Sequence, residues 1–171
     1  SMGFLIDPEQ AVIWRGPMIQ KTIHQFINQV AWGDLDYLLV DLPPGTGDAQ
    51  LSLCQSVPLD GGVIITTPQE ASLGVVRKGV TLFEKVQVPI LGIVENMSGF
   101  RLPDGSRVDI FGHGGVAAEA QKLGLPFLGE LPLALDVRVA GDAGVPIAAT
   151  DGPLAEPYAR LAARLIAGGM G

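Results

Sequence analysis

Short apolar runs alternate along the chain with longer segments that have helical periodicity. The runs are rich in Val, Ile and Leu and nearly continuous, as is typical of strands covered by helices on both faces. They lie at Tyr37–Asp41, Val63–Thr67, Ile90–Glu95 and Pro126–Glu130. Strands that alternate with helices favour βαβ units. The pattern therefore predicts an α/β fold, doubly wound, with a mainly parallel sheet.

The segments between these runs predict helices. The expected helices are Pro17–Val30, Ala49–Ser56, Glu70–Lys85, Gly115–Leu123 and Leu154–Ala167. The segment 97–114 has no helical period and is longer than the usual α/β connection of about 2–6 residues, so we expect a functional loop there. Since no linker or repeat divides the chain, residues 1–171 are expected to form part of a single domain.

Composition narrows the choice of partners and compartment. The net charge of −7 would repel a phosphate backbone, so nucleic acid is not expected as a partner. No apolar run is long enough to cross a bilayer, and no secretion leader is present, so we expect a cytoplasmic protein without a membrane partner. Cys54 is the only cysteine, and in its apolar surroundings it is expected to pack into the core.

The clearest chemical signal follows the first apolar run. Asp41 ends that run, and the next residues are Leu-Pro-Pro-Gly-Thr-Gly-Asp, ending at Asp48. A carboxylate at the carboxyl end of a buried parallel strand lies where α/β sheets bind ligands, and it could hold Mg²⁺. Gly45 and Gly47 leave backbone N–H groups open to an anion. Taken alone, Asp41 could equally cap the next turn.

Motifs in a fixed order resemble the Mrp/ApbC-type iron–sulfur cluster carrier ATPases. These are MinD/ParA-like P-loop NTPases with a deviant Walker A motif. The motifs are Trp14-Arg15-Gly16-Pro17, Asp41–Asp48, Glu95-Asn96-Met97-Ser98 and Asp109–Gly115, and the similarity extends from about Ser1 to Ile147. The resemblance implies a P-loop NTPase fold, ATP and Mg²⁺ as cofactors, a homodimer, and iron–sulfur client proteins as partners.

The resemblance also implies roles for individual residues. Asp41 would be the Walker B carboxylate that organises Mg²⁺, and Gly45 would lie in the switch loop that faces the γ-phosphate. Asn96 would read adenine, for which an amide suits because it offers both a donor and an acceptor. The backbone of Pro132 and Leu133 would lie beside the base. Taken alone, Asn96 at a strand end could instead make a turn.

The chain departs from the family pattern in two places. It contains neither Gly-x-x-x-x-Gly-Lys-Ser/Thr nor Lys-Gly-Gly-x-Gly-Lys, a loop that in the family precedes the start of this chain. We therefore expect this C-terminal portion not to hydrolyse ATP alone, although the parent would be an ATP hydrolase. The family's Cys-Pro-x-Cys pair is also missing, with Leu102 at the first cysteine position. Its absence argues against an iron–sulfur cluster at this loop.

The segment around Leu102 predicts a β-hairpin instead. Pro103-Asp104-Gly105-Ser106 has the chemistry of a tight turn, and Phe100 or Ile110 would pack the hairpin onto the domain or onto a second subunit. His113 lacks partners at ligand spacing, so its flanking glycines are expected to begin a helix and no metal site is predicted. Arg15 could face a nucleotide, a subunit interface or Trp14.

The leading interpretation is an ATP-binding iron–sulfur cluster carrier or scaffold. The alternatives are a MinD/ParA-like positioning switch and a folding unit without activity. A membrane-cycling switch would end in a basic amphipathic helix. The last predicted helix carries Leu161 and Leu165 beside Arg160 and Arg164, but it is short, and we expect it to pack on the core.

Overall fold

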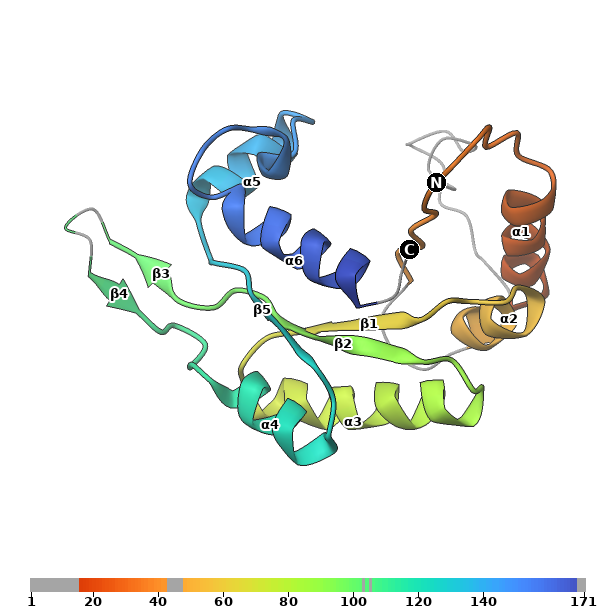
Figure 1. Cartoon of the computed structure of the whole chain (residues 1–171), viewed down its shortest axis with the longest axis horizontal. Helices are drawn as coiled ribbons and strands as arrows, with labels where there is room; N and C mark the ends of the chain where they lie inside the picture. The colour runs from red at the N-terminus through yellow and green to blue at the C-terminus, as the bar shows by residue number, and fades with distance from the viewer. Residues whose placement is uncertain (1–15, 43–47, 103, 105, 169–171) are drawn as a thin grey trace. The chain divides into compact units, whose positions relative to one another are not determined.

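The computed structural model describes residues 16–42, 48–102, 104 and 106–168 (Figure 1). The chain divides into two compact units, residues 1–59 and 60–171.

The first unit contains two helices in contact, α1 (Gly16–Asn28) and α2 (Asp48–Ser56). Both agree with the predicted helices. After α1, the Trp32 indole donates a hydrogen bond to the carbonyl of Phe26 at 2.8 Å. Cys54 is half-buried on α2, and burial raises the pKa of its thiol, in keeping with a packing role.

The predicted strand Tyr37–Asp41 is wrong. This segment has no regular secondary structure, and the side chain of Leu39 is 81% exposed. A strand exists only where a neighbouring strand accepts its backbone hydrogen bonds, and the described part of the first unit contains none. An apolar run thus predicts strand propensity but does not supply the neighbour.

The second unit is built on a parallel sheet with the order β1-β2-β5. Its strands are β1 (Gly62–Thr66), β2 (Ile90–Glu95) and β5 (Phe127–Glu130). All of them fall on predicted runs. The connection between β1 and β2 is α3 (Glu70–Lys85), and α4 (Gly115–Leu123) precedes β5. The α/β prediction is confirmed.

Helices cover both faces of this sheet. On one face, Ile93 packs with α3 and α4 in a cluster that includes Val76 and Val116. On the other, its neighbour Val94 packs with Leu128 and with α6 (Glu156–Ala167), the helix nearest the carboxyl end in Figure 1. Adjacent residues of a strand point to opposite faces, and Ile93 and Val94 are both 0% exposed, so β2 is buried on both sides.

The last helix packs on the core as predicted. Tyr158, Leu161 and Leu165 of α6 lie against the sheet, and Arg164 Nη1 donates to the carbonyl of Leu128 at 2.6 Å. Burial raises the pKa of the Tyr158 hydroxyl. Among the described helices, none is both long enough and apolar enough to span a membrane.

The pattern missed α5 (Leu135–Asp142) and a 3₁₀ turn at Ile147–Ala149. None of the residues of α5 is buried, so the helix has no apolar stripe for periodicity to reveal. Its support is local: Asp136 lies in the first turn, and Arg138 pairs with Asp142 at 2.6 Å across one turn.

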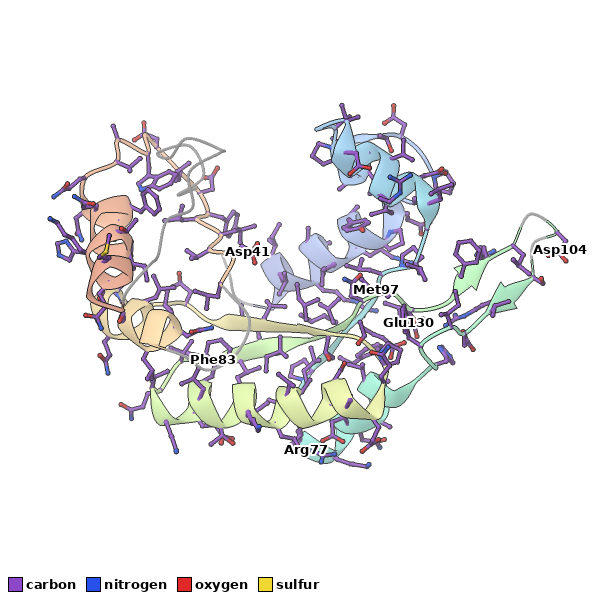
Figure 2. All side chains as sticks on the ribbon, turned by 180° about the vertical axis from the view of Figure 1, so that it is seen from behind. Asp41, Arg77, Phe83, Met97, Asp104 and Glu130 are labelled. Carbon is purple, nitrogen blue, oxygen red and sulfur yellow. The ribbon has the colours of Figure 1, made fainter. Side chains whose placement is uncertain are left out.

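The long loop contains the predicted hairpin. Strand β3 (Phe100–Arg101) pairs antiparallel with β4 (Arg107–Val108). At its tip, Asp104 Oδ1 accepts hydrogen bonds from the hydroxyl and N–H of Ser106, which lower the pKa of Asp104 (Figure 2). Phe100 also bridges to Leu133, which attaches the hairpin to the segment after β5. Pro103 and Gly105 lie outside the described residues.

An ion pair between the half-exposed Arg77 and the buried Glu119 joins α3 to α4 and should make stability depend on pH. The Glu119 carboxylate, 3% exposed, accepts hydrogen bonds from Arg77 Nε at 2.5 Å and Nη2 at 3.2 Å, and this interaction lowers the pKa of Glu119. A lowered folded-state pKa stabilises the fold above the unfolded-state pKa, and the gain is lost as the pH falls through the folded-state value.

We expect Glu119→Gln to lower the midpoint of thermal unfolding at neutral pH. The deficit relative to the parent should shrink as the pH falls below about 4.5, the ordinary value for Glu. Thermal unfolding followed by circular dichroism from neutral to acidic pH checks this. Glu84→Gln removes an exposed carboxylate of α3 and serves as the control. A deficit that is constant across the range would contradict the role given to the ion pair.

Candidate functional site

The carboxyl ends of β2 and β5 continue side by side past the sheet. The Leu131 N–H donates to the carbonyl of Glu95 at 2.8 Å, and the Ser98 N–H donates to that of Leu131 at 2.9 Å. The Leu133 N–H then donates to the carbonyl of Gly99 at 3.1 Å. The structure therefore places Asn96, which follows β2, beside Leu131, the residue before Pro132. This is the edge of an α/β sheet at which ligands bind.

Asn96 makes a turn and still has a donor to offer. Its side-chain oxygen accepts the Met97 N–H at 2.9 Å, and Met97 has a φ of 57°. The Asn96 backbone N–H donates to the carbonyl of Thr66 at 2.7 Å, which fixes the residue against β1. Within the described residues the Nδ2 amide has no partner. The turn interpretation and a ligand-reading role are compatible, because the turn uses only one lone pair of the oxygen.

The turn after β5 can offer only acceptors. Pro132 has no N–H, and the Leu133 N–H is already bonded to Gly99. Because the parallel bridge between Phe100 and Leu133 also engages the Leu133 carbonyl, what remains is the backbone carbonyl oxygen of Pro132. A carbonyl accepts a hydrogen bond from an exocyclic amino group and is repelled by an exocyclic oxygen. The geometry therefore favours a base with an amino group at this edge.

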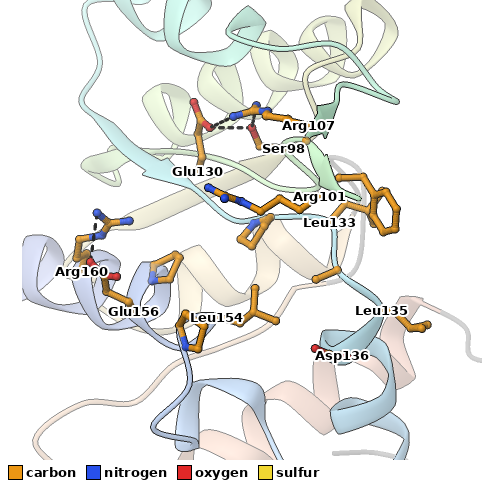
Figure 3. Close-up of a pocket in the computed structure, with 16 residues that line it drawn as sticks. Ser98, Arg101, Arg107, Glu130, Leu133, Leu135, Asp136, Leu154, Glu156 and Arg160 are labelled. Atoms are coloured by element: carbon orange, nitrogen blue, oxygen red, sulfur yellow. Dashed lines mark hydrogen bonds and ion pairs between the residues drawn. The ribbon is translucent and has the colours of Figure 1, made fainter. Parts of the chain in front are cut away.

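A cavity of about 630 Å³ adjoins this turn (Figure 3). It lies between the hairpin, the segment after β5 and the beginning of α6. Pro132 and Leu133 line it, together with the basic residues Arg101 and Arg160, the latter paired with Glu156 at 3.5 Å. Asn96 is not among its lining residues. The structure thus brings two of the predicted base-side residues to a cavity and places the third at the neighbouring strand end.

The residues predicted to act on phosphate and Mg²⁺ belong to the first unit. Asp41 is exposed, follows irregular chain, and its side chain forms no hydrogen bond or ion pair within the described residues. Gly45 lies outside the described residues, as do Trp14 and Arg15. Their predicted roles stay predictions.

A cluster of polar side chains also lies at the strand ends, and we call it the Ser98 cluster. It comprises Glu95, Ser98, Arg107, His113 and Glu130. The Ser98 hydroxyl is 2.7 Å from Glu95 Oε1 and 2.9 Å from Glu130 Oε2. The Arg107 guanidinium lies 2.6 Å from His113 Nδ1, 3.2 Å from Ser98 Oγ and 3.6 Å from Glu130 Oε2.

The expectation that His113 lacks partners is wrong. Its imidazole Nδ1 lies 3.9 Å from Glu130 Oε1, and one potential ligand atom each from His113, Glu95 and Glu130 lies within 4.8 Å of the others. Sequence spacing missed this because the partners end two different strands. The signal available was that Glu95 and Glu130 are charged residues that close otherwise apolar runs.

The glycines beside His113 do begin a helix, as predicted. Gly114, at φ 71°, precedes the first turn of α4, and the Val116 N–H donates to Glu95 Oε2 at 3.3 Å. A Cβ added at Gly115 would lie 2.8 Å from the carbonyl oxygen of Pro68, so the helix start requires glycine there.

Arg107 connects the hairpin to the strand ends, a role the sequence did not reveal. Besides its contacts in the Ser98 cluster, its Nε donates to Asp109 Oδ1 at 2.7 Å, and this hydrogen bond raises the pKa of Arg107. The hairpin of this chain is thus held by a guanidinium where the family pattern has cysteines.

Solved structures define the class of fold. The nucleotide-binding protein of Archaeoglobus fulgidus, solved in complex with ADP with Co, matches with a TM-score of 0.67 and 44% identity over 74% of this chain and 53% of that chain. The cell division ATPase MinD of Pyrococcus furiosus matches in fold with a TM-score of 0.65 at 19% identity, over 92% of this chain and 63% of that one. The chain has the α/β fold of the P-loop NTPases.

The chain belongs to the family described as ParA: NUBPL iron-transfer P-loop NTPase, whose sequence model matches residues 1–166. It is 57% identical over 149 residues to the iron-sulfur cluster carrier protein of Synechocystis, covering 86% of this chain and 42% of the relative. It is 47% identical over 169 residues to the iron-sulfur cluster transfer protein NUBPL of Dictyostelium discoideum, covering 97% and 52%. The chain therefore spans about half the length of these relatives.

Proposed function

We propose that this chain is the base-reading, C-terminal part of a single P-loop NTPase domain in an ATP-binding iron–sulfur cluster carrier. The carrier is proposed to act as a cytoplasmic homodimer that passes clusters to client proteins. The observation that supports the nucleotide role is that the Asn96 Nδ2 amide has no partner among the described residues and lies at the ligand-binding edge of the sheet, where Pro132 offers a carbonyl but no N–H. The names of the curated relatives support the carrier role.

The proposed base site uses complementary hydrogen bonds. The Asn96 Nδ2 amide donates to a ring nitrogen of adenine, and the carbonyl of Pro132 accepts from the exocyclic amino group. The Leu133 N–H holds the turn against Gly99, so the carbonyl keeps its direction when no ligand is bound. ATP thus fits the described residues on its base side.

Mg²⁺ is proposed to bind at Asp41, with Gly45 facing the γ-phosphate. The Asp41 carboxylate is exposed and has no partner among the residues that the structure describes, which suits a hard cation that prefers oxygen ligands. When bound, Mg²⁺ neutralises phosphate charge. The lysine that would accompany it belongs to a motif that the 171 residues do not contain.

The cluster is the proposed cargo rather than a resident cofactor of the hairpin. A cluster needs thiolate ligands, and the hairpin has Leu102 at the first cysteine position of the family pattern, while the second position is deleted between Asp104 and Gly105. The described residues of the hairpin therefore do not fit a cluster. We propose that the hairpin keeps its shape through Arg107 and the Phe100 bridge instead.

An ATP hydrolysis assay tests whether this chain, which has the proposed base contacts but not the phosphate-binding loop motif, is active by itself. We expect the chain with Mg²⁺ and ATP to release phosphate no faster than a blank, because it lacks the lysine and backbone cradle that grip the phosphates. A coupled phosphate assay on the parent and on Asp41→Ala measures this. Steady release by the parent that Asp41→Ala abolishes would show a complete catalytic site in this chain and contradict the proposal.

A further inference from the structure

The Ser98 cluster brings two carboxylates, those of Glu95 and Glu130, to one hydroxyl donor and one guanidinium. The Ser98 hydroxyl has one hydrogen but lies within hydrogen-bond distance of two carboxylates, at 2.7 Å from Glu95 and 2.9 Å from Glu130. Glu95 is 0% exposed, and within the described residues its carboxylate forms no ion pair. A buried carboxylate is costly unless a positive charge accompanies it. The cluster is therefore suited to hold a cation near the Ser98 hydroxyl.

The guanidinium of Arg107, which reaches the cluster from the hairpin, provides part of this positive charge. Its guanidinium reaches His113, Ser98 and Glu130, but its side chain is 39% exposed and its Nε is bonded to Asp109. Because arginine only donates, its 2.6 Å contact with His113 means that the Nδ1 lone pair of the imidazole is directed at the guanidinium. The nitrogen that Arg107 contacts is the same Nδ1 that lies 3.9 Å from Glu130 Oε1.

The three potential ligands are close enough to converge on one ion. One ligand atom each from Glu95, His113 and Glu130 lies within 4.8 Å of the others, and His113 Nδ1 is 3.9 Å from Glu130 Oε1. Ligand atoms bonded to a tetrahedral ion at about 2.1 Å are about 3.4 Å apart, so the group must contract slightly.

The backbone around His113 permits this contraction. Gly112 and Gly114 flank it with φ angles of 91° and 71°, and an added Cβ at either would meet no atom within 4 Å. The backbones of the two glutamates, in contrast, are held at the ends of β2 and β5. The imidazole can therefore approach carboxylates whose backbones are held by the sheet.

We propose that Glu95, His113 and Glu130 form a site for a divalent transition-metal ion such as Zn²⁺, Fe²⁺ or Co²⁺, and that Arg107 occupies this site when no metal is bound. A mixed imidazole and carboxylate set suits these ions. Metal and guanidinium exclude each other, because both need the His113 lone pair and the Glu130 carboxylate. Binding of the metal releases Arg107, and with it the contact between β4 and the strand ends.

Metal titration of the purified chain tests this site. Zn²⁺ binding is measured by calorimetry, and Co²⁺ binding by its visible absorption. We expect one ion per chain and, because a competing positive charge is removed, binding to Arg107→Gln that is about tenfold tighter or more than binding to the parent. Arg107→Lys retains a flexible charge and should fall between them. Circular dichroism establishes that each variant is folded.

The two histidines of the chain provide matched controls. In the Arg107→Gln background, His113→Ala should weaken Zn²⁺ binding by about tenfold or more, whereas His24→Ala, on exposed α1, should leave it unchanged. Equal affinity of the parent and Arg107→Gln would overturn the proposal, as would binding that survives His113→Ala. Neither result depends on nucleotide binding. The proposed metal site can therefore be rejected without rejecting the proposed nucleotide function, and the reverse also holds.

Discussion

Replacing Gly92 with alanine is expected to destabilise the second unit by about 2–6 kcal/mol. Gly92 lies in β2, the central strand, with a φ of 150°, a conformation that L-residues rarely adopt. An added Cβ would lie 2.6 Å from Leu128 Cγ and 2.7 Å from the carbonyl oxygen of Pro126. That same carbonyl accepts the Ile93 N–H, so relief of the clash disturbs the pairing of β2 with β5.

Urea denaturation followed by circular dichroism measures this effect. Gly74→Ala is the matched control, because an added Cβ there meets no atom within 4 Å and the residue lies within α3. Alanine should stabilise that helix by about 0.5–1 kcal/mol. If Gly92→Ala changed the free energy of unfolding by less than about 0.5 kcal/mol, the packing described for the central strand would be wrong.

Anaerobic reconstitution with iron and sulfide is expected to give no charge-transfer absorption. Cluster formation needs several thiolates, and this chain has only Cys54, which is half-buried on α2 with a raised pKa that disfavours the thiolate. The hairpin should keep its antiparallel pairing in the absence of iron, because Arg107 and Phe100 attach it to the strand ends.

A relative that carries the Cys-Pro-x-Cys pair, treated in parallel, is the positive control. Cys54→Ser shows whether any absorption arises from the lone thiol. A stoichiometric cluster that bridges two copies of the chain would contradict the assignment of the hairpin.

The buried strands were predictable because their surroundings are simple. Ile90–Glu95 is apolar on both faces and buried on both faces, so the run and the strand coincide. The hairpin was predictable from local turn chemistry around Asp104. Tyr37–Asp41 has the same apolar character, but the described residues contain no strand that pairs with it. The helix α5 forms although none of its residues is buried. Periodicity reports burial, so it fails in both cases.

The residues of the candidate site were harder to predict from the sequence than the fold. Asn96 and Pro132 came from a resemblance, and the structure adds which of their polar atoms are free. Arg107 and the partners of His113 could not be predicted, because the ends of β2 and β5 and the hairpin meet only after the sheet forms. Distances across a sheet edge do not follow from spacing along the chain.

Discrimination between adenine and guanine tests the base-reading role most directly. ATP and GTP are titrated into isotope-labelled chain with Mg²⁺, and weak binding is followed by NMR. We expect the chain to bind ATP about tenfold or more tightly than GTP. Asn96→Ala should lower the ATP affinity by about five- to tenfold, which corresponds to the free energy of one hydrogen bond. Asn28→Ala, on exposed α1, should have no effect. Equal affinity for the two nucleotides, unchanged by Asn96→Ala, would contradict the base-reading role.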